Sequence, residues 1–130
     1  MQFDLVSFLK TKPVIAVIGA TNDKNKYGNI IMRDLAGKGF TAIPINPRAD
    51  AVEGVHAYPD LSSAVKSNKI DLLVYVVPPP ITLRSLEEAE KLNLKKVWIQ
   101  PGAGDEKVKN FLERENFNYL MNACVMVEAY

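Results

Sequence analysis

The sequence predicts an α/β fold, a Rossmann-like three-layer αβα sandwich around a five-stranded parallel sheet. Short apolar runs alternate with segments of helical periodicity along the chain, without a repeat or a break. The first run, Val14 to Ile18, is β-branched at four of five positions, which suits a parallel strand buried on both faces. Strands separated by helices favour right-handed crossovers. We therefore expect the strands, numbered along the chain, to lie in the order 3-2-1-4-5.

The first half of the chain is expected to begin with a short helix capped by Asp4 and packed through Leu5, Phe8 and Leu9. After the strand at 14–18, Tyr27, Ile31 and Leu35 recur at four-residue intervals, which predicts a helix. The elements expected next are a strand over 41–45, a loop over 46–57 with Gly54 at a turn, and a short helix capped by Asp60.

The second half contains the strongest predicted strand, the unbroken apolar run Leu72 to Val77, which we expect to lie centrally. Pro78, Pro79 and Pro80 end it. The elements expected after it are a helix with Leu83, Leu86 and Ala89 on one face, a strand over 97–99, a helix capped by Asp105, and a last strand over 119–121, with 125–127 as a further strand candidate.

Length and composition indicate one ordinary globular domain over 1–130, since 48% of the residues are hydrophobic, 24% are charged and the net charge is +1. There is no basic stripe, so we expect no nucleic-acid partner. No apolar run approaches the roughly 18 residues of a membrane helix, and we see no signal-peptide pattern, so we expect a cytoplasmic protein without membrane contact. Cys124 and His56 are alone of their kinds, which argues against a Cys/His zinc site, and we expect no metal.

Gly19 ends the first strand, and the helix that begins near Tyr27 would point its N–H groups and positive dipole end back over that strand. This arrangement predicts a phosphate site. The match to the dinucleotide fingerprint is poor, because Ala20 and Thr21 follow Gly19 and the next glycine is Gly28, nine residues after the first. The alternative is that Gly19 only closes a strand.

In such a sheet, ligands bind outside the carboxyl ends of the strands. The strand ends predicted to form the walls of one site are 19–22, 46–48, 77–79, 100–102 and 122–124. An NAD site usually places Asp or Glu at the end of the second strand, but here Asn46 holds that place with Arg48 nearby, which favours a phosphorylated ribose. The alternative is a turn with a solvated arginine.

Six pieces of the sequence together resemble those of the small stand-alone CoA-binding domains, which are similar to the N-terminal domain of the succinyl-CoA synthetase alpha subunit. The resemblance covers about Val14 to Met126, and its pieces are Ile15-Ala-Val-Ile-Gly-Ala-Thr21, Tyr27-Gly28, Pro44-Ile-Asn-Pro-Arg48, Val77-Pro78, Val97-Trp-Ile-Gln-Pro-Gly102 and Asn122-Ala-Cys124.

The resemblance implies that the chain binds coenzyme A. It places the diphosphate at 19–22, with Lys24 or Lys26 compensating for a loop that is less glycine-rich than the synthetase's. Arg48 would lie near the ADP end, Val77 and Pro78 beside the adenine, and 99–102 toward the pantetheine. The full set of expected contact residues is Gly19, Ala20, Thr21, Asn22, Lys26, Tyr27, Asn46, Arg48, Val77, Pro78, Pro79, Ile99, Gln100, Pro101, Gly102, Asn122 and Cys124.

Two classes of function remain open at this point. The favoured class is a non-catalytic CoA or acyl-CoA binding module, with a protein partner or a second copy of the chain left open. The synthetase's phosphorylated histidine lies in a second domain, His56 matches nothing catalytic, and Glu87, Glu88 and Glu90 are interpreted as a solvated helix face. The alternative is an NADP-linked oxidoreductase or a nicotinamide-sensing domain. Cys124 is expected to pack as a small hydrophobe or to form a mixed disulfide with CoA.

Overall fold

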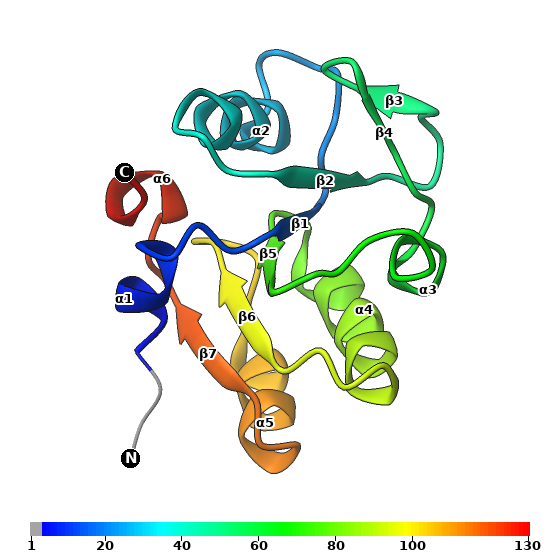
Figure 1. Cartoon of the computed structure of the whole chain (residues 1–130). Helices are drawn as coiled ribbons and strands as arrows, with labels where there is room; N and C mark the ends of the chain where they lie inside the picture. Colours follow the sequence, from blue (N-terminus) through cyan, green and yellow to red (C-terminus); the bar gives the residue numbers. More distant parts are fainter. Residues whose placement is uncertain (1–3) are drawn as a thin grey trace.

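The computed structural model describes residues 4–130, which form a five-stranded sheet between two layers of helices (Figure 1). All strand pairs of this sheet are parallel. The predicted Rossmann-like α/β sandwich is therefore confirmed. The strands, in their spatial order, are β2 (Ala42–Ile45), β1 (Ile15–Ile18), β5 (Leu72–Tyr75), β6 (Lys96–Ile99) and β7 (Asn118–Met121).

Each face of the sheet has its own apolar core. One core contains buried residues of β1 together with those of α1 (Leu5–Leu9), α2 (Tyr27–Gly37) and α6 (Val125–Glu128). The opposite core joins the sheet to α3 (Leu61–Ala64), α4 (Pro79–Lys91) and α5 (Glu106–Arg114). Figure 1 shows these two groups of helices on either side of the sheet.

The predicted strand order was wrong. Numbered as in the prediction, the observed order is 2-1-3-4-5, because β5 pairs with β1 on the side opposite β2. Pro44 explains the edge position of β2, since a proline lacks the N–H that an interior strand would donate. Its carbonyl accepts the Tyr58 N–H at 3.0 Å, so this peptide faces away from β1 toward the segment that covers the edge. The predicted central place of 72–77 is confirmed, because β5 lies between β1 and β6.

The predicted loop over 46–57 contains a small antiparallel hairpin, β3 (Ala51–Val52) and β4 (Val55–His56). Glu53 and Gly54 form its two-residue turn with φ of 49° and 77°, a conformation that favours Gly at one position. The signal in the sequence was the glycine, which was expected at a turn but not at the turn of a hairpin.

Residues 125–127 belong to helix α6 and not to a strand. Asn122 has φ of 61°, which turns the chain away from the sheet after β7. The Gln100 Oε1 atom accepts the Val125 N–H at 2.8 Å, and the Trp98 indole donates to the Ala123 carbonyl at 2.8 Å. These buried contacts hold the segment against the end of β6, where it forms a helical turn.

The three predicted aspartate caps are present. Asp4 accepts N–H bonds from Val6 and Ser7, Asp60 accepts one from Ser63, and Asp105 accepts one from Val108. The chain over 4–130 contains no helix that is long and apolar enough to cross a membrane.

Candidate functional site

A cleft of about 720 Å³ opens at the carboxyl ends of β1, β2 and β5. Its walls are the loop after β1, the loop after β2, the start of α3, the loop after β5 and the first turns of α4. In a sheet of order 2-1-3-4-5, ligands bind beside the first strand where the chain order reverses, and this cleft lies there. We call it the strand-end cleft, and its lining includes Gly19, Thr21, Lys26, Asn46, Arg48, Pro78, Ile81, Arg84 and Glu88.

Gly19 and Gly28 bring the loop after β1 against its neighbours more closely than any other residue would allow. Gly19 has φ of 107°, and a Cβ there would lie 2.8 Å from Val77 Cγ1 and 3.0 Å from the Val76 carbonyl oxygen. A Cβ on Gly28 would lie 2.0 Å from the Gly19 carbonyl oxygen. Helix α2 therefore begins directly over the end of β1.

The start of α2 is open for an anion. No side chain caps it, and its N-cap residue, Lys26, lines the strand-end cleft. The Asn29 N–H bonds to the Lys26 carbonyl at 3.0 Å, so the amides of Tyr27 and Gly28 are the donors left without an acceptor among residues 4–130, at the positive end of the helix dipole. Tyr27 stands at this point with 66% of its surface exposed. The combination of free amides, a cation and an exposed ring suits a phosphate next to an apolar group.

The start of α4 faces the same cleft but has a different chemistry. Pro78 is its N-cap residue, and Pro79 and Pro80 open the helix without any N–H group to offer. The Thr82 hydroxyl donates to the Val77 carbonyl at 3.2 Å, and Ile81 remains 41% exposed. This wall therefore suits an apolar part of a ligand.

Asn46 joins the loops after β1 and β2. Its Nδ2 atom donates to the Ala20 carbonyl at 2.9 Å, while its Oδ1 atom accepts the Arg48 N–H at 2.7 Å and the Ala49 N–H at 3.0 Å. Both the nitrogen and the oxygen of the Asn46 side-chain amide thus form hydrogen bonds that hold the two loops together. The Arg48 side chain is exposed at the edge of the cleft, with no ion pair among residues 4–130.

The hairpin β3–β4 supports the loop after β1 from the other side. The Asn22 side chain donates to the Ala51 carbonyl at 2.8 Å and accepts the Glu53 N–H at 3.1 Å. Asn29, which is fully buried, donates to the Thr21 carbonyl at 2.9 Å and to the Glu53 carboxylate at 2.8 Å. These contacts hold the loop in a fixed shape before any ligand binds.

The two carboxylates of the strand-end cleft hold the start of α3. Asp60 caps this helix, and hydrogen bonds from the Ser63 side chain and backbone lower the pKa of the Asp60 carboxyl. Glu88 reaches across from α4: Oε1 accepts the Leu61 N–H at 3.1 Å, and Oε2 accepts the Ser62 N–H at 3.1 Å and hydroxyl at 2.7 Å. The prediction that Glu88 is part of a solvated helix face was therefore wrong. The cations of the cleft are Lys26, Arg48 and Arg84.

A second cleft of about 530 Å³, the adjoining cleft, shares five lining residues with the first one: Gly19, Lys26, Val76, Val77 and Pro78. Its outer end is formed by the turn after β6, where Gly102 has φ of 87°. The two clefts bring together most of the predicted residues. The first contains Gly19, Ala20, Thr21, Lys26, Asn46, Arg48, Val77 and Pro78, and the second adds Tyr27, Pro79, Pro101 and Gly102.

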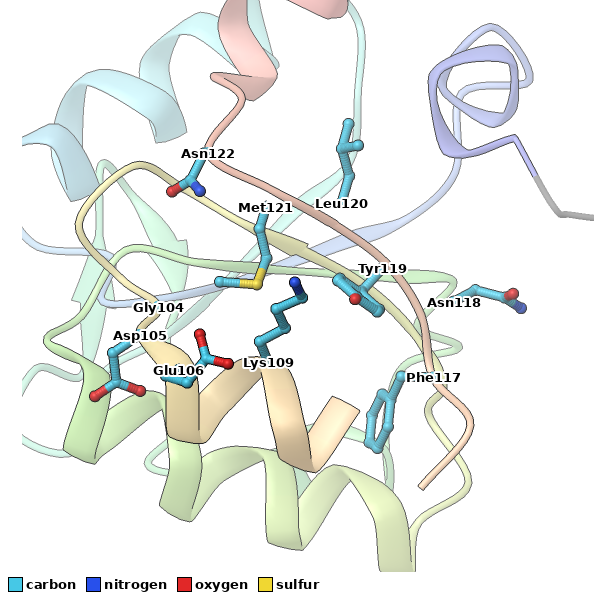
Figure 2. Close-up of a pocket in the computed structure, with 10 residues that line it drawn as sticks. All are labelled: Gly104, Asp105, Glu106, Lys109, Phe117, Asn118, Tyr119, Leu120, Met121 and Asn122. Atoms are coloured by element: carbon cyan, nitrogen blue, oxygen red, sulfur yellow. The ribbon is translucent and has the colours of Figure 1, made fainter. Parts of the chain in front are cut away.

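The remaining predicted residues line neither cleft. Asn22 bonds to the hairpin, Ile99 is fully buried, and Gln100 is 5% exposed because its amide turns inward to α6. The partly buried Cys124 Sγ atom lies 3.5 Å from the Gln100 Nε2 atom. Asn122 lies in a separate groove between α5 and β7, beside Met121 and above Glu106 (Figure 2).

Helix α4 contributes a wall of the strand-end cleft that the sequence did not predict. Ile81, Arg84, Ser85 and Glu88 follow one another at helical spacing and all line the cleft. Below them, the Tyr75 hydroxyl lies 3.1 Å from the Ser85 hydroxyl, and burial raises the pKa of this tyrosine. The helical pattern had assigned Leu86 and Ala89 to the core, so the same periodicity contained the signal for the cleft-facing residues.

Comparison with protein families gives one match, to the model described as "CoA binding domain", over residues 13–130. Among curated proteins, the chain is 35% identical over 119 residues to an acetate–CoA ligase (ADP-forming) of Methanocaldococcus jannaschii, and 34% identical over 106 residues to acetate–CoA ligase (ADP-forming) I of Archaeoglobus fulgidus. These matches cover 85% and 78% of the chain but 17% and 15% of the ligases. The chain therefore corresponds to less than a fifth of the length of these proteins.

Solved structures of similar fold include small proteins and parts of large ones. A conserved hypothetical protein from Pyrococcus furiosus has a TM-score of 0.84 at 39% identity, covering 90% of this chain and 99% of its own. Dinucleotide forming acetyl-coenzyme A synthetase 1 from Ca. Korarchaeum cryptofilum, in complex with phosphate and ADP, has a TM-score of 0.68 at 28% identity, covering 91% of this chain and 26% of its own. The fold thus occurs both alone and within a larger enzyme.

Proposed function

The chain belongs to the CoA-binding domain family, and from this premise we propose that it binds coenzyme A or an acyl-CoA in the strand-end cleft. The observation that carries the proposal is the open start of α2. Gly28 lets this helix begin directly over the Gly19 carbonyl, and no side chain caps the amides beside Lys26. A diphosphate is the ligand group that this arrangement favours.

We assign the other parts of the ligand from the chemistry of the walls. The adenine lies against the apolar start of α4, near Val77, Pro78 and Ile81. The pantetheine arm runs through the adjoining cleft toward Pro101 and Gly102, as the resemblance to CoA-binding domains implied. The 3′-phosphate lies beside Arg48, whose planar fork can bind two phosphate oxygens at once.

We further propose a binding or regulatory role in the cytoplasm, and not catalysis by the chain itself. The carboxylates of the cleft accept hydrogen bonds from α3, which favours a structural role for both over acid–base chemistry on a ligand. The curated relatives are ADP-forming ligases of which the chain spans less than a fifth, so a protein partner that supplies the remaining domains fits this role.

The direct test is titration calorimetry of the purified chain with CoA, NAD and NADP. We expect CoA to bind most tightly, because the second strand ends in Asn46 and Arg48 and lacks the carboxylate that holds an unphosphorylated ribose. Mass spectrometry of any ligand released by denaturation identifies the acyl group. NAD binding as tight as CoA would contradict the proposal, and preferential NADP binding would favour the nicotinamide alternative.

A further inference from the structure

Arg84 lies on the cleft-facing side of α4 but belongs to none of the predicted binding residues. Its neighbours on that side, Ile81 and Ser85, line the strand-end cleft with it, while Leu86 packs in the core. Arg84 comes five residues after Pro79, so it stands roughly 7.5 Å along the helix from its start at a rise of about 1.5 Å per residue. It is therefore set about one and a half turns beyond the prolines that open α4.

The guanidinium of Arg84 has no ion pair among residues 4–130. Glu88 stands four residues further along the helix, at the spacing where an ion pair commonly forms. Both oxygens of Glu88 instead accept bonds from Leu61 and Ser62 of α3. The other acid of the cleft, Asp60, accepts the Ser63 N–H at 2.8 Å. The acids are thus occupied, and the arginine head group remains available.

The cations of the two clefts fall into two groups, and each group indicates its own position for an anion. Lys26 lines both clefts at the start of α2, where the diphosphate is assigned. Arg48 and Arg84 line the strand-end cleft alone, from the loop after β2 and from α4. These two arginines line one cleft from different elements, both without an ion pair among the described residues, so a single anion bound there can meet both.

We propose that Arg84 and Arg48 together bind the 3′-phosphate of the ligand, an inference that rests on the proposed function. A phosphate monoester carries a charge of about −1.5 to −2 at pH 7, so one guanidinium leaves it incompletely neutralised. A second guanidinium from another wall of the cleft supplies the missing charge and further directed N–H groups. The pair selects CoA against ligands that lack this phosphate.

The test measures affinities for CoA and dephospho-CoA in the wild type, Arg84→Ala, Arg48→Ala and the double variant. We expect each single variant to bind CoA roughly 10- to 100-fold more weakly, while affinity for dephospho-CoA changes by less than about twofold. The double variant should bind the two ligands equally. Arg84→Lys should retain part of the preference, because it keeps the charge and loses the fork.

Arg114→Ala is the matched control, because Arg114 lies on α5 and bonds to Glu115 outside the strand-end cleft. It should leave both affinities unchanged. Circular dichroism melting of each variant checks the fold, and Arg84→Gln repeats the measurement with a side chain of similar length if the alanine variant melts early.

Several outcomes would overturn the inference and leave the proposed function intact. One is a wild type that binds CoA and dephospho-CoA equally well. Another is an Arg84→Ala variant that keeps its preference for CoA. A third is an Arg84→Ala variant that loses affinity for both ligands equally, which would place Arg84 beside the adenine. A wild type that binds neither ligand would instead overturn the proposed function, and the inference with it.

Discussion

Two helices of this protein begin at the same cleft after neighbouring strands, and their first residues have opposite chemistry. Helix α2 begins after β1 with Lys26, Tyr27 and Gly28, without a side-chain cap. Helix α4 begins after β5 with Pro78 and Pro79. Both helices direct the positive end of a dipole toward the cleft, but only α2 offers N–H groups there. The dipole is therefore common to both helix starts, and the N–H donors are what distinguish α2 as the proposed phosphate site.

The same difference separates the polar and apolar ends of the proposed ligand. Glycine lets α2 approach the Gly19 carbonyl, so its amides come within reach of a diphosphate. Proline fixes the start of α4 without donors and leaves Ile81 exposed for an apolar contact. A ligand with a diphosphate next to apolar groups matches both helix starts when its diphosphate lies at α2 and its apolar part at α4. The reverse orientation would place the phosphates against the prolines of α4.

The largest expected effect comes from Gly28→Ala at the start of α2. The new methyl group would lie 2.0 Å from the Gly19 carbonyl oxygen, so the helix must move away from the loop. We expect unfolding free energy to fall by roughly 3 kcal/mol or more, the upper range for overpacking, and CoA binding to be lost. Urea unfolding and calorimetry measure the two effects.

Gly37→Ala is the matched control, since it lies in the same helix and its Cβ would meet no atom within 4 Å. Alanine there should raise stability by up to about 1 kcal/mol and leave binding unchanged. Equal behaviour of the two variants would show that close approach of α2 to the loop is not required.

On the side of α4, Glu88→Gln tests how this helix is fixed to α3. The carboxylate accepts three hydrogen bonds from Leu61 and Ser62, and an amide presents one oxygen in place of two. We expect a loss of about 1.5–3 kcal/mol in unfolding free energy. Glu87→Gln, on the exposed neighbour, should stay within about 0.5 kcal/mol. A similar loss in both variants would contradict the anchoring role.

A smaller effect is expected when the lysine at the start of α2 is compared with a proline at the start of α4. Lys26→Ala should weaken CoA binding roughly three- to tenfold, because it removes a cation beside the diphosphate. Pro80→Ala adds an N–H group to α4 but should change the affinity by less than about twofold, since the proposed orientation places no phosphate there. Lys24→Ala is the control, because Lys24 lines neither cleft. A stronger effect from Pro80 than from Lys26 would contradict the proposed orientation, and a stronger effect from Lys24 would assign the diphosphate contact to that lysine.

Local signals in the sequence predicted much of this arrangement, and contacts between distant segments account for the errors. Apolar runs predicted the five strands of the parallel sheet, and aspartate caps predicted the starts of α1, α3 and α5, because both signals depend on neighbouring residues. Strand order depends on pairing across the sheet, and its one local signal, Pro44 as an edge residue, was overlooked. The side-chain direction of Gln100 and the reach of Glu88 to α3 depend on elements 25 and 26 residues away. No local pattern could have shown them.

The smallest expected effect is that of low pH. As pH falls, the α3 and α4 side of the cleft should lose stability before the start of α2 does. Hydrogen bonds from the Ser63 side chain and backbone lower the pKa of Asp60 in the folded state. A carboxyl with a lowered folded pKa stabilises the fold above its unfolded value of about 3.9, and this contribution is lost as pH falls through the folded pKa. Helix α2 has no acidic residue in its first turn and no side-chain cap to lose.

We therefore expect the Ser63 amide resonance to titrate with a midpoint below 3.9 in an NMR pH series. Asp60→Asn should abolish this titration while keeping the cap, because asparagine caps helices about as well as aspartate. A midpoint at or above 3.9, or the same titration in the asparagine variant, would show that the Asp60 carboxylate does not hold this side of the cleft.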